Sequence, residues 1–183
     1  MADARARSPL ADRVADLTTI GAELVPFLAQ VDLRVDPEHA DLAPYALPLE
    51  PNTAWHDEHH AALWLGPDEW LILGSADTAH EIVTALETAF ADVQRSVVDV
   101  SANRVAIALT SDDRLELLSH VCSLDLDPRV WTAGRCAQTL LGRAQVILVE
   151  RDRTTPVLVR PSFADYVVDL LVAVRGATGG VGA

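Results

Sequence analysis

The sequence contains no lysine: all 14 of its basic residues are arginines, and its 27 acidic residues give a formal net charge of −13. A chain without lysine cannot form a Schiff base, hold pyridoxal phosphate covalently or supply the lysine of a phosphate-binding loop. The excess of negative charge also makes the chain a poor match for a phosphate backbone. Lysine-based catalysis is therefore excluded, and we expect no nucleic-acid partner.

Cysteine and long apolar runs are also scarce. The two cysteines, Cys122 and Cys136, are too few for a disulfide framework, and nothing else in the sequence supports a redox pair between them. No apolar run approaches the roughly 18 residues of a membrane span. The N-terminal segment MADARARSPL lacks the apolar stretch of a signal peptide. We therefore expect a soluble, cytoplasmic protein without a membrane partner.

The remaining composition is that of an ordinary globular chain. Of the 183 residues, 50% are apolar and 22% are charged, which is typical of a folded domain. A chain of this length buries roughly 70% of its extended surface, so its core needs no disulfide or metal. We expect a flexible N-terminus over residues 1–16, a single α+β unit over 17–175 with halves at about 17–96 and 97–175, and a flexible glycine-rich tail over 176–183.

Apolar periodicity predicts strands and helices in a mixed order. Strands are expected at residues 31–35, 61–65, 70–73, 96–100, 104–109, 136–141, 146–151 and 157–159, and helices at 78–91, after Thr110 and after Ser162. Gly21 and Pro26 limit the helical pattern of residues 17–31 to a short helix or turn. Residues 36–60 are expected to be mostly loop, with an edge strand near Tyr45–Leu49.

The strands at 61–65 and 70–73 do not alternate with polar residues, so both of their faces should be covered. Connections of hairpin length favour antiparallel pairing. We therefore predict an α+β fold with mainly antiparallel sheets covered by helices, in two ferredoxin-like halves.

No segment carries a convincing active site. The histidine cluster at residues 56–60 suits a metal only in part, because two imidazoles are adjacent and no further ligand completes the set; a solvated loop is the simpler interpretation. Cys122 and His120 lie on different faces of a helix, which favours a buried thiol over a nucleophile–base pair. The Gly-x-Gly motif at residues 180–182 has no room for a following helix. We predict no catalytic, cofactor-binding or metal-binding residue in this chain.

Five segments match a known family in sequence and in order. They are VDVSANRVAIAL (98–109), CSLDLDP (122–128), GRCAQTLLGRA (134–144), RPSFADYVVDL (160–170) and the turn LGPDEW (65–70). Together they cover most of residues 61–172, whereas the first 60 residues match weakly. With these segments the chain resembles the gamma subunit of heterotetrameric sarcosine oxidase.

The resemblance implies a non-catalytic, structural subunit whose fold is related to the folate-binding aminomethyltransferases, the group of the glycine-cleavage T-protein. The family's complex is an oxidoreductase that oxidises sarcosine to glycine and produces hydrogen peroxide, with formaldehyde or 5,10-methylenetetrahydrofolate. The resemblance also implies alpha, beta and delta subunits as partners. These would hold FAD, FMN, NAD and zinc, with tetrahydrofolate as co-substrate. The alternative is a stand-alone folate-binding or one-carbon-transfer protein.

Candidate contact residues follow from aromatic and charge patterning. Trp64 and Trp70 flank a turn and suit either the core or an aromatic anchor at a subunit interface. Residues 1–96 hold 17 acidic residues and 5 arginines, whereas residues 97–183 hold 10 and 9. Arginine is favoured at interfaces. We therefore predict subunit contacts through Trp64, Trp70, Arg135 and Arg143, with ordinary surface ion pairing as the alternative for the arginines.

Overall fold

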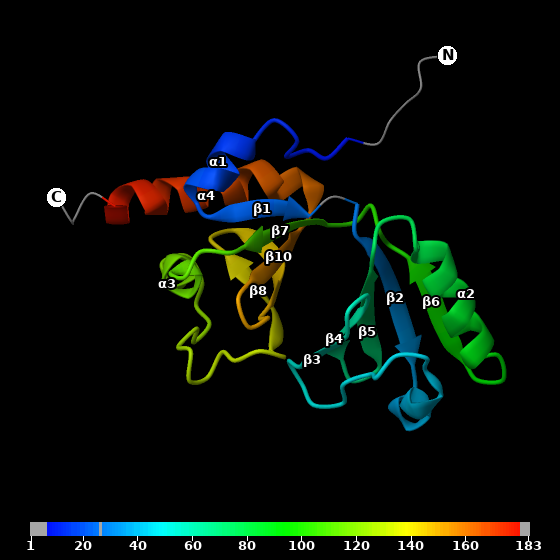
Figure 1. Cartoon of the computed structure of the whole chain (residues 1–183). Helices are drawn as coiled ribbons and strands as arrows, with labels where there is room; N and C mark the ends of the chain where they lie inside the picture. The colour runs from blue at the N-terminus through cyan, green and yellow to red at the C-terminus, as the bar shows by residue number, and fades with distance from the viewer. Residues whose placement is uncertain (1–6, 26, 180–183) are drawn as a thin grey trace, which may run out of the picture.

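The computed structural model describes residues 7–25 and 27–179, which form two five-stranded sheets with helices on their outer faces (Figure 1). Sheet A has the order β1 (Ala22–Val25), β7 (Val105–Leu109), β10 (Thr155–Val159), β9 (Ala144–Val149) and β8 (Cys136–Leu141). Sheet B has the order β3 (Ala54–His56), β4 (Ala61–Gly66), β5 (Glu69–Gly74), β2 (Ala29–Val35) and β6 (Arg95–Asp99). All neighbouring strands are antiparallel, which confirms the predicted α+β class.

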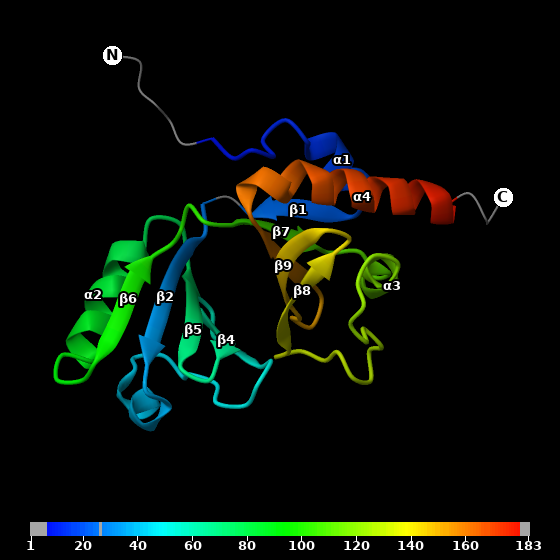
Figure 2. The same cartoon turned by 180° about the vertical axis from the view of Figure 1, so that it is seen from behind.

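Helices cover the side of each sheet that faces away from the other sheet. The helices are α1 (Val14–Thr19), α2 (Ala79–Ala89), α3 (Arg114–Ser119) and α4 (Pro161–Gly179), with a 3-10 helix η1 (Pro37–Leu42). Helices α1 and α4 lie together beside β1 and β7, and α2 lies against β6, as the two opposite views show (Figure 2). In sheet B, β2 lies between β5 and β6, which α2 connects; this is the split β-α-β arrangement of ferredoxin-like sheets.

Strands such as β5 and β9 are apolar on both faces because one face packs under helices and the other against the second sheet. In β5, Trp70 and Ile72 join the cluster under α2, while Leu71 and Leu73 join the cluster between the sheets. In β9, Val146 faces the helices of sheet A and Ile147 faces sheet B. Successive side chains point to opposite faces, and both faces are buried. The sequence of these strands therefore shows no alternation of apolar and polar residues.

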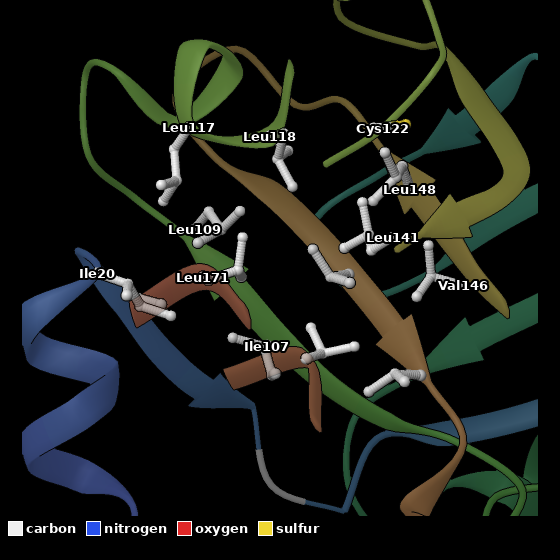
Figure 3. Close-up of a cluster of buried hydrophobic side chains, with 14 of the residues drawn as sticks. Ile20, Ile107, Leu109, Leu117, Leu118, Cys122, Leu141, Val146, Leu148 and Leu171 are labelled. Atoms are coloured by element: carbon white, nitrogen blue, oxygen red, sulfur yellow. The ribbon is translucent and has the colours of Figure 1, made fainter. Parts of the chain in front are cut away.

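The two sheets are interleaved along the chain. Strand β1 precedes all of sheet B, yet it pairs with β7 of sheet A, with Ala22 opposite Leu109. Figure 3 shows that Ile20, Leu109 and Leu171, from three distant segments, enter one buried cluster of sheet A. A division at residue 96 therefore does not separate the sheets, because α1 and β1 belong with the second half.

The predicted strands and helices from residue 61 onward are confirmed within a few residues, and the N-terminal segments need corrections. The edge strand expected near Tyr45–Leu49 is wrong: Pro44 and Pro48 lack N–H donors for a ladder. The predicted loop 36–60 contains η1 and β3. Strand β1 was not predicted; Gly21, at φ +65°, ends the preceding helix and turns the chain into the strand.

The chain ends also differ from the expectation. Leu10, in the segment expected to be flexible, is fully buried in the core of sheet A. Helix α4 continues to Gly179, so residues 176–179 are helical rather than part of a tail. The rest of the expected flexible ends, residues 1–6 and 180–183, lies outside the described residues. Within the described part of the chain, no helix is long and apolar enough to cross a membrane.

Candidate subunit-contact surface

The tryptophans predicted as contact residues face each other across β4 and β5. The side chain of Trp70 is fully buried, and its indole N–H donates to the carbonyl of Pro48 at 2.8 Å. A contact role for Trp70 is therefore wrong, and it belongs to the core, as the alternative interpretation held. Trp64 is half-buried, so its contact role stays a prediction.

The two arginines lie at opposite ends of β8. Arg135 Nη1 is 3.5 Å from Glu50 Oε1, and its side chain is 38% exposed. Arg143 is exposed in the β8–β9 turn, where its backbone N–H donates to Tyr166 Oη of α4 at 3.1 Å. The turn requires glycine at position 142, because φ is +56° and a Cβ would collide with the Tyr166 hydroxyl. The structure thus does not gather the predicted residues into one site, and the contact roles of Arg135 and Arg143 stay predictions.

Both cysteines are buried and serve as packing groups. Cys136 lies in the cluster between the sheets and Cys122 in the helix-side cluster, so sheet A separates the two thiols. The Cys136 thiol donates to the carbonyl of Thr53 at 3.1 Å. Burial raises the pKa of Cys136 to about 11, so the nucleophilic thiolate is scarce at neutral pH. This geometry leaves no redox pair.

The histidine cluster folds as a hydrogen-bonded turn between β3 and β4. Asp57 Oδ1 accepts the backbone N–H groups of His59 and His60 at 2.8 and 2.7 Å, which lowers the pKa of Asp57. The ring of His60 packs near Tyr45, with 4.9 Å between centroids. Over the described residues, no group of three or more His, Cys, Asp or Glu side chains is placed to hold a metal ion.

A buried ion pair, which the sequence analysis missed, connects α3 to the β9–β10 hairpin. Arg114 Nη2 lies 2.5 Å from Glu150 Oε1, and their side chains are 11% and 4% exposed. Thr155 Oγ1 accepts from Arg114 Nε at 3.0 Å and donates to Glu150 Oε2 at 2.5 Å, so it closes the network. The signal in the sequence is a carboxylate directly after the apolar strand β9. The buried charges of Arg114 and Glu150 are paired and hydrogen-bonded, as a structural ion pair in a protein interior requires.

A sequence model of the sarcosine oxidase, gamma subunit family matches residues 35–175. The chain is 32% identical over 182 residues to sarcosine oxidase subunit gamma of Corynebacterium sp. (strain P-1), covering 91% of this chain and 88% of that protein. The subunit gamma of an Arthrobacter sp. matches with the same identity and coverage.

Among solved structures, this chain aligns with a chain of the heterotetrameric sarcosine oxidase from Corynebacterium sp. U-96 in complex with pyrrole 2-carboxylate. The TM-score is 0.87 and the sequence identity is 26%, and the alignment covers 97% of this chain and 98% of that chain. Aminomethyltransferase T of the glycine cleavage system from Bartonella henselae aligns with a TM-score of 0.65 and 11% identity over 86% of this chain and 48% of that chain, which shows a shared fold alone. The fold, the family match and the relatives agree, and the chain belongs to the sarcosine oxidase gamma subunit family.

Proposed function

We propose that this chain is the gamma subunit of a heterotetrameric sarcosine oxidase and that it acts by packing against the other subunits. The observation that carries the proposal is the alignment with a chain of such an enzyme, at a TM-score of 0.87 over nearly the full length of both chains. The oxidation of sarcosine to glycine and hydrogen peroxide would then take place in the assembled complex.

A structural role agrees with how the chain uses its reactive groups. The Cys136 thiol is buried with a raised pKa, and the charges of Arg114 and Glu150 neutralise each other in the interior. These groups support packing rather than contact with a substrate. In this proposal alpha, beta and delta subunits are the partners. They hold FAD, FMN, NAD and zinc, tetrahydrofolate is the co-substrate, and the complex resides in the cytoplasm.

Co-expression tests the proposal. The chain is produced with the candidate alpha, beta and delta subunits, and a matched strain lacks only this chain. We expect a complex that contains all four subunits and consumes sarcosine with release of hydrogen peroxide, and a loss of assembled, active enzyme when this chain is omitted. Equal assembly and turnover without the chain would contradict the proposal.

The alternative of a stand-alone folate-binding protein is supported only by the fold shared with aminomethyltransferase T. Calorimetry of the isolated chain with tetrahydrofolate separates the two. Binding tighter than about 1 mM, or roughly −4 kcal/mol, would favour the alternative.

A further inference from the structure

Two arginines meet at one end of sheet A. Strands β7 and β10 pair with Val105 opposite Val159. The next residue in this register on each strand is an arginine, Arg104 before β7 and Arg160 after β10. Like charges at opposed positions of neighbouring strands destabilise a sheet. Folding alone gives no reason for this pair.

Both arginines line a hollow of about 290 Å³ at the edge of sheet A. Its other walls include Gln138 of β8, whose amide donates to the carbonyl of Leu65 at 3.0 Å, and Gln145 of β9, whose amide can donate a hydrogen bond. Arg160 is exposed and Arg104 half-buried. The hollow is therefore open to a ligand from solution or from a partner.

Neither arginine of this hollow has a direct ion pair within the described part of the chain. Arg160 Nη1 donates to the neutral amide oxygen of Asn103. Within residues 7–25 and 27–179, no carboxylate lies within 4.0 Å of either guanidinium, as is also true of Arg143, Arg151 and Arg153, whereas arginines such as Arg13 and Arg34 have such a partner.

The surroundings of Arg104 disfavour its positive charge, which an anion in the hollow would stabilise. Burial, and next the charge of Arg160, lower the pKa of Arg104, and they outweigh the more weakly acting carboxylates Asp32 and Glu69. In addition, Arg160 directly precedes the 19-residue helix α4, whose N-terminal end carries a partial positive charge. A chain with a net charge of −13 thus places two arginines without a directly paired carboxylate at one hollow.

We propose that Arg104 and Arg160 form a binding site for an oxyanion, whose carboxylate or phosphate oxygens lie between the two guanidinium groups. Guanidinium groups bind such oxygens through paired, charge-assisted hydrogen bonds. The volume suits a small organic acid, a phosphate or one acidic side chain. The oxyanion comes either from a free small molecule or from an Asp or Glu of a partner subunit; only the second source rests on the proposed function.

Titration of the full-length chain with citrate, and separately with inorganic phosphate, tests the site by calorimetry at constant ionic strength. If the source is a free molecule, we expect millimolar or tighter binding and a dissociation constant weakened by about tenfold or more in Arg104→Gln and Arg160→Gln. Arg153→Gln is the matched control, because Arg153 is exposed outside the hollow and its loss changes the net charge equally. Circular dichroism verifies that each variant is folded.

Assembly with the other subunits distinguishes the second source. If a partner carboxylate occupies the hollow, Arg160→Gln weakens co-purification while Arg153→Gln does not, and neither anion binds the isolated chain. The proposal is overturned if the wild-type chain binds neither anion and Arg104→Gln and Arg160→Gln assemble like wild type. Failure of the wild-type chain to assemble would instead count against the proposed function. In that case, binding of citrate or phosphate that depends on Arg104 and Arg160 would support the oxyanion site, and its absence would contradict it.

Discussion

At the residue scale, the buried thiol of Cys136 links the stability of the fold to alkaline pH. Burial raises the pKa of Cys136 from 9.0 to about 11. Well below pH 9 the thiol is protonated in both the folded and the unfolded chain. As the pH rises from 9 to 11, the unfolded chain ionises first, so the stability that depends on the neutral thiol is lost.

We therefore predict that wild type loses stability relative to Cys136→Ala over this range, by on the order of 2–3 kcal/mol. Urea unfolding at several pH values measures it. The absence of lysine leaves few other groups that titrate there, and Cys122→Ala is the control for the second thiol. A stability difference between wild type and Cys136→Ala that stays constant with pH would contradict the prediction.

Sequence reasoning identified buried residues better than polar partners. The apolar runs around Leu63 and Leu71 already indicated coverage on both faces. The ion pair of Arg114 with Glu150 and the apposition of Arg104 with Arg160 depend on strand register and on the placement of a helix. Neither is encoded in local periodicity, so both became visible only in the folded chain.

At the scale of elements, the Arg114–Glu150–Thr155 network holds α3 on the β9–β10 hairpin. We predict that Arg114→Met destabilises the protein by about 3–5 kcal/mol, because it leaves the Glu150 carboxylate buried without a counter-charge. The double variant Arg114→Met/Glu150→Gln should recover a large part of this loss, because the amide is neutral and still accepts from Thr155. Chemical denaturation measures both, and an additive loss in the double variant would contradict the explanation.

Strand β1 shows why some elements escape prediction. Its four residues lie within a stretch whose apolar spacing of three and four is typical of a helix. The segment is extended because β7 offers it an open edge, a tertiary effect that overrides local preference. The hairpins β4–β5 and β8–β9, in contrast, are local in sequence and were predicted.

At the scale of the whole molecule, the interleaving of the sheets predicts cooperative unfolding. Trp70 reports on sheet B and Trp131 on the core of sheet A. Urea transitions of the wild-type chain followed by tryptophan fluorescence and by far-UV circular dichroism should coincide, because the inter-sheet cluster joins the halves. Leu63→Ala in that cluster should lower the free energy of unfolding by about 2–5 kcal/mol. Both urea midpoints should therefore fall together. Two separate midpoints in the wild-type chain would contradict this view.

The position of β1 has a consequence for the order of events during synthesis on the ribosome. All five strands of sheet B have been synthesised once residue 99 is made, whereas sheet A at that point still lacks β7, β8, β9 and β10. The apolar residues of α1 and β1 are made first but must wait for β7 and α4 before they are covered. The earliest part of the chain is thus among the last to reach its native place, and its exposed apolar surface is the stretch that a nascent-chain chaperone would meet.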